Sequence, residues 1–278
     1  NLSADEKRSY KESALCLMRA PSRMRFPGAI TRYDDLVYVH QQQSSYPEGR
    51  DVWHVTGQFL AAHRLYCYLF ELMMRNECGY NGRMAYWEEF SDAGNFRNSA
   101  FLRDFGGSGD SDGYVHDNEF STIDLNLGPG LENHRRKLRR SINDTASAMG
   151  SQQYVDEAMS KNTFVEFLAT IRSFSHLAGH NGVGGELGDV QTAPVDIIFF
   201  SHHIYIDYLW DKWQRARPEA RLFDIQRSGY ETQANPIVET NYMTDISFLG
   251  LAPSVPMYSA LDTQVSRSKF ILHIESKF

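Results

Sequence analysis

The sequence predicts a mainly α-helical protein whose core is a four-helix bundle holding a dinuclear metal site, with long loops and a few short β-strands. Two long segments repeat apolar residues at helical spacing, and each carries a histidine on its apolar face. The chain has 278 residues, of which 42% are hydrophobic, and this is enough to bury a sizeable core. We therefore expect a single domain over residues 1–278, with its helical core at about 30–215.

The first two helices have recognisable start and stop signals. Thr31 and Asp34 have the spacing of a capping box, so a helix is expected from Thr31 through His40. A second helix is expected from about residue 56 to residue 75, because Gly79 follows it as a stop signal.

The third and fourth helices are expected after a long gap in the sequence. Thr163 and Glu166 form a second potential capping box, which starts a helix that runs to about residue 180. Pro194 suits the first turn of a helix, and the fourth helix is expected from there to about residue 215.

The remaining segments are less regular. Residues 91–130 are rich in Gly, Asp and Asn, which is typical of long surface loops. Residues 229–278 contain short β-prone runs such as 270–274, interrupted by prolines, so an irregular, β-rich C-terminal segment is expected.

The second and fourth helices share a stripe of inward-facing residues. In each stripe a phenylalanine precedes a histidine by one turn, and the steps are four, three, four and three. The stripes are Phe59, His63, Tyr66, Phe70 and Met73, and Phe199, His203, Ile206, Trp210 and Trp213. A lone histidine on an apolar face is more often a hydrogen-bonded core residue than a ligand, so neither one alone indicates a metal.

Four further histidines favour metal ligands over hydrogen-bonded core residues. His176 and His180 are four residues apart on a predicted helix, the spacing of paired metal ligands, while His40 ends another helix and His54 lies nine residues before His63. The six form two groups of three, which are His40, His54 and His63, and His176, His180 and His203. This pattern predicts a dinuclear centre between facing helices.

The donor set narrows the choice of metal. Imidazole suits zinc, copper, iron and nickel. Dizinc and di-iron sites usually include bridging carboxylates, and none lies at ligand spacing here. Two copper ions are therefore favoured, and a dizinc hydrolase at the same histidines stays open as an alternative.

Two segments of the chain resemble the copper motifs of the type-3 copper proteins, and most closely those of short fungal tyrosinases and catechol oxidases. The first runs from His54 to Arg64 (HVTGQFLAAHR) and the second from Asp196 to His203 (DIIFFSHH). The resemblance covers about residues 30–215. It implies that the first histidine group binds one copper ion and the second group the other, with dioxygen as co-substrate.

The resemblance also implies roles for neighbouring residues. His202 would be a non-ligand, Phe59 and Phe199 would pack against ligand rings, and Asp207 would fix the orientation of a ring. The chain departs from the family pattern at four positions that are not ligands, namely Ala61, Ala62, Gly182 and Ile197.

The implied activity is oxidation of small phenolic substrates, converting o-diphenols to o-quinones while dioxygen is reduced to water. In the family, an Asn after the first ligand of the second group is associated, together with a Glu and a water, with deprotonating monophenols. Leu177 occupies that position, so we expect a catechol oxidase with weak or no monophenol hydroxylation. Full tyrosinase activity and a haemocyanin-like dioxygen carrier are the alternatives.

Leu177, Asn181 and Gly184 are expected to line the substrate pocket. Glu166 is a candidate for holding the water, although its place in a capping box is already a sufficient structural reason for it and is favoured by about two to one.

Charge and composition exclude other partners. The formal net charge is −7 and the basic residues are scattered, so no nucleic acid is expected as a partner. No segment has the apolar length of a membrane span, so no membrane is expected either.

The cysteines and sequons bear on the compartment. Three cysteines, Cys16, Cys67 and Cys78, permit at most one internal disulfide and leave its pairing open. Sequons at Asn1 and Asn143 would accept glycans on a secretory route. We expect a secreted, processed protein with no C-terminal shielding domain. Because Val52 stands near His54 with no cysteine close by, no thioether to that ring is expected.

Overall fold

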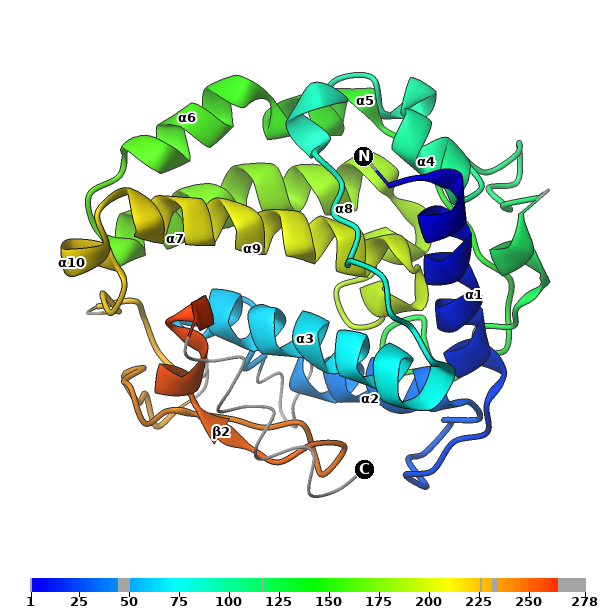
Figure 1. Ribbon diagram of the computed structural model, residues 1–278, viewed down its shortest axis with the longest axis horizontal. Coiled ribbons are helices and arrows are strands. Elements are labelled where there is room, and N and C mark those ends of the chain that lie inside the picture. The colour runs from blue at the N-terminus through cyan, green and yellow to red at the C-terminus, as the bar shows by residue number, and fades with distance from the viewer. Residues whose placement is uncertain (1, 45–50, 117, 226, 232–234, 265–278) are drawn as a thin grey trace.

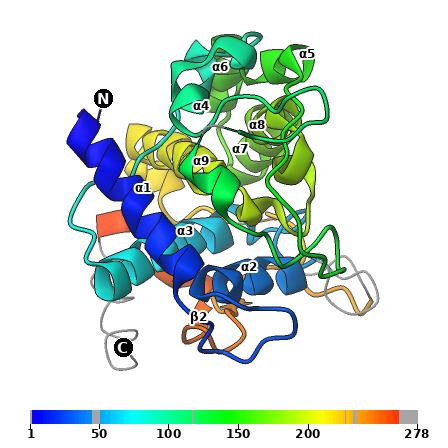
Figure 2. The same cartoon turned by 90° about the vertical axis from the view of Figure 1, so that its right-hand side faces the viewer.

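Four long helical segments form the core of the protein. The computed structural model describes residues 2–44, 51–116, 118–225, 227–231 and 235–264. Helices α2 (Arg32–Gln43) and α3 (Phe59–Cys78) make one layer, and α7 (Phe164–Ile171), α8 (Leu177–Val183) and α9 (Ile198–Ala216) make the other. Figures 1 and 2 show the two layers packed face to face. The predicted fold class, a mainly helical protein with a four-helix core, is confirmed.

The capping signals in the sequence locate the helix starts. The Thr31 and Thr163 side chains each accept a hydrogen bond from the third backbone N–H of their helix, and Asp34 and Glu166 complete the two capping boxes. Gly79 ends α3 with a φ of +67°, a left-handed conformation that favours glycine.

Two predicted boundaries shift by a few residues. Helix α3 begins at Phe59 rather than near residue 56. Helix α9 begins at Ile198 because Pro194 lies in a separate short turn, Ala193–Val195. The Asp196 carboxylate then accepts from the backbone N–H of Ile198 at the start of α9.

Several helices were not predicted. Helix α1 (Ala4–Arg19) begins with a capping box between Ser3 and Glu6 and crosses the outside of the core (Figure 2). The others are α4 (Ala100–Asp104), α5 (Asp144–Ser147), α6 (Gln152–Ser160) and α10 (Pro218–Arg221). Residues 91–130 are otherwise irregular, as expected, apart from α4 and short 3-10 turns.

The two predicted stripes form the centre of the core. Every member of both is buried, with at most 3% of the side chain exposed. Arg140 and Asp196 form a fully buried ion pair, in which Arg140 donates two hydrogen bonds, at 2.7 and 2.9 Å. This pair connects the helical layers to the loops. Arg140 further donates to the carbonyls of Phe105 and Gly107.

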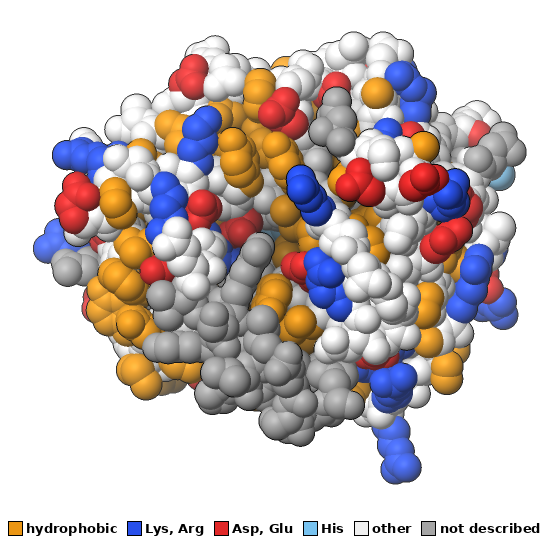
Figure 3. Space-filling model, viewed as in Figure 1, with side chains coloured by type: hydrophobic (Ala, Val, Ile, Leu, Met, Phe, Trp, Pro, Cys, Tyr) orange, Lys and Arg blue, Asp and Glu red, His pale blue; other side chains and the backbone are white. Residues whose placement is uncertain are grey.

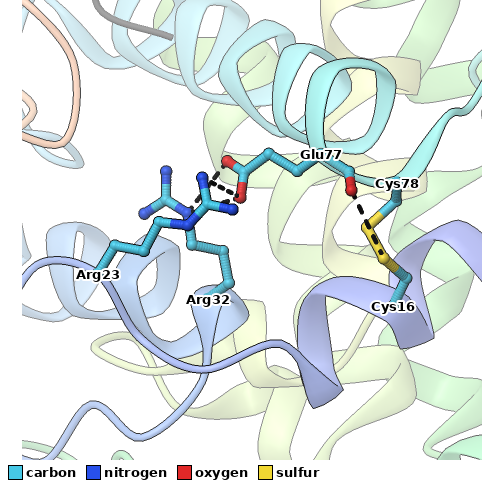
Figure 4. Close-up of a disulfide and its surroundings, with 5 residues drawn as sticks. All are labelled: Cys16, Arg23, Arg32, Glu77 and Cys78. Atoms are coloured by element: carbon cyan, nitrogen blue, oxygen red, sulfur yellow. Dashed lines mark hydrogen bonds and ion pairs between the residues drawn. A yellow bond between two sulfur atoms is a disulfide. The ribbon is translucent and has the colours of Figure 1, made fainter.

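A disulfide joins Cys16 of α1 to Cys78 at the end of α3 (Figure 4). Next to it, Glu77 accepts from Arg32 Nε at 3.0 Å and pairs with Arg23 at 3.2 Å. The third cysteine, Cys67, is a buried free thiol. The structure thus supplies the pairing that the sequence left open.

The C-terminal part carries the only strands of the described residues. β1 (Asp245–Ile246) pairs antiparallel with β2 (Val255–Pro256). The β-prone run 270–274 and Asn1 lie outside the described residues. Within the described part of the chain, no helix combines the length and apolar character that crossing a membrane requires. On the face shown in Figure 3, basic and acidic side chains are interspersed.

Candidate dinuclear metal centre

Two groups of buried histidines face each other between the layers. In the first group, His40 at the end of α2, His54 in the loop before α3 and His63 on α3 each offer a ring nitrogen, and these atoms lie within 4.8 Å of one another. In the second group, nitrogens of His176, His180, His202 and His203 lie equally close. The structure therefore brings the six predicted histidines together in the two expected groups, with His202 beside the second.

Aromatic side chains connect the groups. The rings of His63 and His203 stack with centroids 4.2 Å apart. Phe59 packs on His63 at 4.8 Å and on His176 of the other group at 4.7 Å. Phe199 packs in the same way on His203 at 4.2 Å and on His40 at 5.0 Å. Each phenylalanine thus holds one ring from each group, and both exclude water from the centre.

Backbone carbonyls set the proton positions on three rings. The Nδ1 atom of His40 lies 2.9 Å from the Gln191 carbonyl, that of His63 2.8 Å from Phe59 and that of His180 2.7 Å from Leu187. A carbonyl only accepts, so each Nδ1 carries the proton and the lone pair on Nε2 is left for a metal.

Several other ring nitrogens in the two groups are buried and have no hydrogen-bond partner among the described residues, as expected of ligand atoms without their metal. Among the described residues, buried ring nitrogens without a hydrogen-bond partner are His40 Nε2, His63 Nε2, both nitrogens of His176, His202 Nε2 and His203 Nδ1. The Nε2 atoms of His180 and His203 are 3.3 Å apart. Two nitrogens about 2 Å from one ion at a tetrahedral angle lie about 3.3 Å apart. Buried unpaired polar atoms are costly, and a pair of metal ions would satisfy those of His40 and His63 and one nitrogen of His176.

Burial keeps these rings uncharged. Burial lowers the pKa of five ligand candidates well below the usual imidazole range, and neighbouring histidines in the site lower it further. The five are His40, His63, His176, His180 and His203. Neutral imidazole is the form that binds a metal. These five rings are therefore ready to bind metal at neutral pH without first losing protons.

A π-helical turn, Arg172–His176, joins α7 to α8 and carries the first ligand of the second group. Such turns occur often at functional sites. Three residues later, the backbone of Gly179 lies against the ring of His202, since a Cβ added there would be 2.3 Å from Nδ1. This close approach requires glycine.

The sequence did not reveal Glu89, a fully buried carboxylate at this site. One of its oxygens contacts His202 Nδ1 at 2.5 Å, and its other oxygen has no hydrogen-bond partner among the described residues. Burial raises the pKa of Glu89 and lowers that of His202 to about 3. Glu89 thereby holds His202 beside the second group. Its only signal in the sequence is its position two residues after Trp87, and that does not indicate a contact 113 residues away.

The structure corrects the role expected for Asp207. Within the described part of the chain, each ligand Nδ1 either contacts a group other than Asp207 or has no hydrogen-bond partner. Asp207 instead accepts from Arg64 Nε, and the Arg64 guanidinium lies 3.8 Å from the centre of the Trp210 ring. The guanidinium therefore binds the carboxylate that the family pattern assigned to a ligand ring.

The role considered for Glu166 is also corrected. Its side chain is exposed and completes the Thr163 capping box, which lowers the pKa of the carboxyl. The alternative favoured from the sequence, a structural role, is the one observed.

The three pocket candidates differ in their positions. Leu177 is 44% exposed and Asn181 is also exposed, each one residue after a buried histidine. Gly184 instead faces the backbone of Ser141, 2.5 Å from where its Cβ would lie, with a φ of +62°. Gly184 is thus required for packing of the chain rather than for lining a pocket.

A helical core with two facing groups of three buried histidines is the architecture of a dinuclear type-3 copper centre. The model of the common central domain of tyrosinase matches residues 30–216, and the chain belongs to this family. Tyrosinase ustQ of Aspergillus flavus is 29% identical over 286 residues, covering 95% of this chain and 75% of that protein.

Solved structures agree with this assignment. A polyphenol oxidase from Thermothelomyces thermophila superposes with a TM-score of 0.85 at 25% identity, covering 96% of this chain and 85% of that one. A functional unit of octopus haemocyanin shares the fold, with a TM-score of 0.55 at 17% identity over 78% of this chain and 52% of that one. The chain is therefore a tyrosinase-like oxidoreductase, and its family implies copper as the metal.

Proposed function

We propose that the protein is a dinuclear copper oxidase that converts o-diphenols to o-quinones, with little or no hydroxylation of monophenols. Two diphenols give up four electrons and four protons, which reduce one dioxygen to two waters. His40, His54 and His63 would hold one copper ion and His176, His180 and His203 the other. The bound pair supplies the redox chemistry.

The single observation that carries the proposal is the pair of facing histidine groups with unpaired, neutral ring nitrogens. The chain's own contribution is to hold each ring in one orientation and to keep the centre dry. Backbone carbonyls do the first for three rings, and Phe59 and Phe199 do the second.

The preference for diphenols rests on Leu177. Its partly exposed side chain follows His176 directly and can neither accept nor donate a hydrogen bond. A monophenol needs a group that removes its proton, and Leu177 cannot take that part. In the family this group is associated with monophenols, so diphenol oxidation is the activity expected with Leu177 in its place.

The test combines copper content with oxygen uptake. We expect two copper ions per chain, rapid oxygen consumption with 4-methylcatechol and little with 4-methylphenol. Leu177→Asn should raise the monophenol rate, whereas Leu131→Asn, at a leucine 57% exposed elsewhere on the surface, should not. Copper binding without turnover would indicate a dioxygen carrier, and equal rates on both substrates would indicate a full tyrosinase.

We also propose that the protein passes through a secretory route. The Cys16–Cys78 disulfide supports this, because such bonds persist in oxidising compartments. A glycan at Asn143 would agree, and mass spectrometry of the protein from its native source tests it.

A further inference from the structure

His54 stands out among the six histidines because it lies in an irregular segment rather than in or at the end of a helix. Residues 51–58 have no regular secondary structure. Two side chains fold this segment back on itself, since Thr56 Oγ1 donates to the Val52 carbonyl at 3.0 Å and Gln58 Nε2 donates to the same oxygen. Helix geometry therefore does not set the direction of the His54 ring, and a specific contact must do so.

Asp51 supplies that contact. Its Oδ1 atom accepts from the backbone N–H groups of Trp53 and His54, both at 2.9 Å. Its Oδ2 and Oδ1 atoms also lie 3.0 and 3.2 Å from His54 Nδ1. The two side chains are only 15% and 11% exposed. One carboxylate thus fixes both the turn of the backbone and the ring that the turn carries.

The chemistry of this contact differs from that at the other rings. His40, His63 and His180 donate Nδ1–H to neutral carbonyls, whereas His54 faces a carboxylate. An ionised carboxylate only accepts, so the proton stays on Nδ1 and the Nε2 lone pair points away from Asp51. Hydrogen bonds to a charged acceptor are also stronger than those to a neutral one, and such a partner makes the ring a better metal ligand.

We propose that Asp51 is the positioning residue of the first metal site, acting through His54, an inference that rests on the proposed function. Asp51 does not touch metal or substrate. Among the described residues, His54 is the only ligand candidate outside the helical framework. Asp51 holds its ring in the tautomer and orientation that bind metal. The first group depends on it for tight binding and the second group does not.

Asp51→Asn changes the closer ring contact, that of Oδ2, and keeps the backbone contacts of Oδ1. The amide oxygen can still accept from the N–H groups of Trp53 and His54, while the amide nitrogen, a donor, then faces Nδ1. A donor there favours the tautomer with its proton on Nε2, and that tautomer cannot bind metal. We expect copper at the first site to bind about 10- to 100-fold more weakly.

A matched control is available on the surface. Asp110 Oδ1 accepts from the backbone N–H groups of Asp112 and Tyr114, at 2.8 and 2.9 Å, and its Oδ2 contacts His116 Nε2 at 2.7 Å. His116 is 62% exposed and belongs to neither histidine group. Asp110→Asn therefore makes the same chemical change at a turn that carries no ligand.

The experiment dialyses copper-loaded wild type, D51N and D110N against a graded series of chelator concentrations. Copper per chain and the electron paramagnetic resonance spectrum are then measured. At chelator concentrations where wild type and D110N keep two copper ions per chain, D51N should keep one. The two coupled Cu(II) spins of wild type and D110N give no paramagnetic resonance signal, whereas D51N should show the signal of an isolated Cu(II).

The contrary results are distinct. D51N that retains two copper ions with wild-type resistance to chelator, or loses both together, overturns the role of Asp51 alone. The same conclusion follows if metal-free D51N unfolds well below metal-free D110N, because Asp51 would then act on the fold rather than on the ring. Wild type that binds no copper pair overturns the proposed function as well.

Discussion

Metal-free protein should lose stability steeply as the pH falls below 7. The five rings with strongly lowered pKa values, those of His40, His63, His176, His180 and His203, stay neutral in the folded protein. After unfolding they titrate near pH 6.5. Below that pH the unfolded chain binds more protons than the folded protein, so the free energy of unfolding decreases as the pH decreases.

The size of the effect follows from the number of rings. Each contributes up to about 1.4 kcal/mol per pH unit below pH 6.5. Relative to pH 7, five rings together remove about 3 kcal/mol at pH 6 and about 6 kcal/mol at pH 5.5. The raised pKa of Glu89 and the lowered pKa of His202 act in opposite directions over this range. Domains are commonly stable by about 5–15 kcal/mol, so much of the stability is lost by pH 5.5.

The assay is urea unfolding of chelator-treated protein between pH 5.5 and 8, followed by tryptophan fluorescence with the disulfide intact. His176→Gln removes one of the five rings and should reduce the loss at pH 5.5 by about 1 kcal/mol, whereas His116→Gln, at an exposed ring, should leave it unchanged. Copper holds the rings neutral, so the loaded protein should keep its stability to lower pH. A free energy of unfolding that changes by less than about 1 kcal/mol between pH 7 and 5.5 would refute the reasoning.

Three further predictions concern the framework around the site. Replacing Cys16 and Cys78 by Ala opens a connection of 62 residues and should lower the free energy of unfolding by up to about 4 kcal/mol, measured by urea unfolding against Cys67→Ala. Arg140→Met leaves the Asp196 carboxylate buried without a counter-ion and should cost about 3–5 kcal/mol; a cost below 1 kcal/mol would contradict the importance of this pair. Gly179→Ala forces a Cβ into the neighbouring imidazole and should cost about 1–3 kcal/mol while weakening copper retention in a chelator series. Unchanged retention in that variant would show that the close approach is not needed.

The parts of the fold that follow local rules could be predicted from the sequence. The stripes through His63 and His203 repeat every three or four residues, and such a repeat fixes which face of a helix is buried. The caps at Thr31 and Thr163 involve partners three residues away. Helix α1 was not predicted, although Ser3 and Glu6 form a cap of the same kind.

Contacts between distant segments could not be predicted in the same way. Asp207 lies four residues after His203, which places both on one side of α9. That spacing alone does not show that a guanidinium on another helix, Arg64, binds the carboxylate. Glu89 is the opposite case. It has no periodic relation to any histidine in the sequence, and it contacts His202 because a loop packs against α9.

Both errors have one physical cause. A carboxylate that is wholly or partly buried pairs with a donor that lies close to it, because leaving either group unpaired is costly. Periodicity predicts which residues are buried but not how buried donors and acceptors pair. His63 and His203 escape this limit because the two stripes bring them together, and Phe59 and Phe199 each pack on a ring from both groups. Apart from Phe59 on α3, the residues that orient those rings lie in loops or short turns, and the contacts of Asp51, Leu187 and Gln191 are seen only in the folded protein.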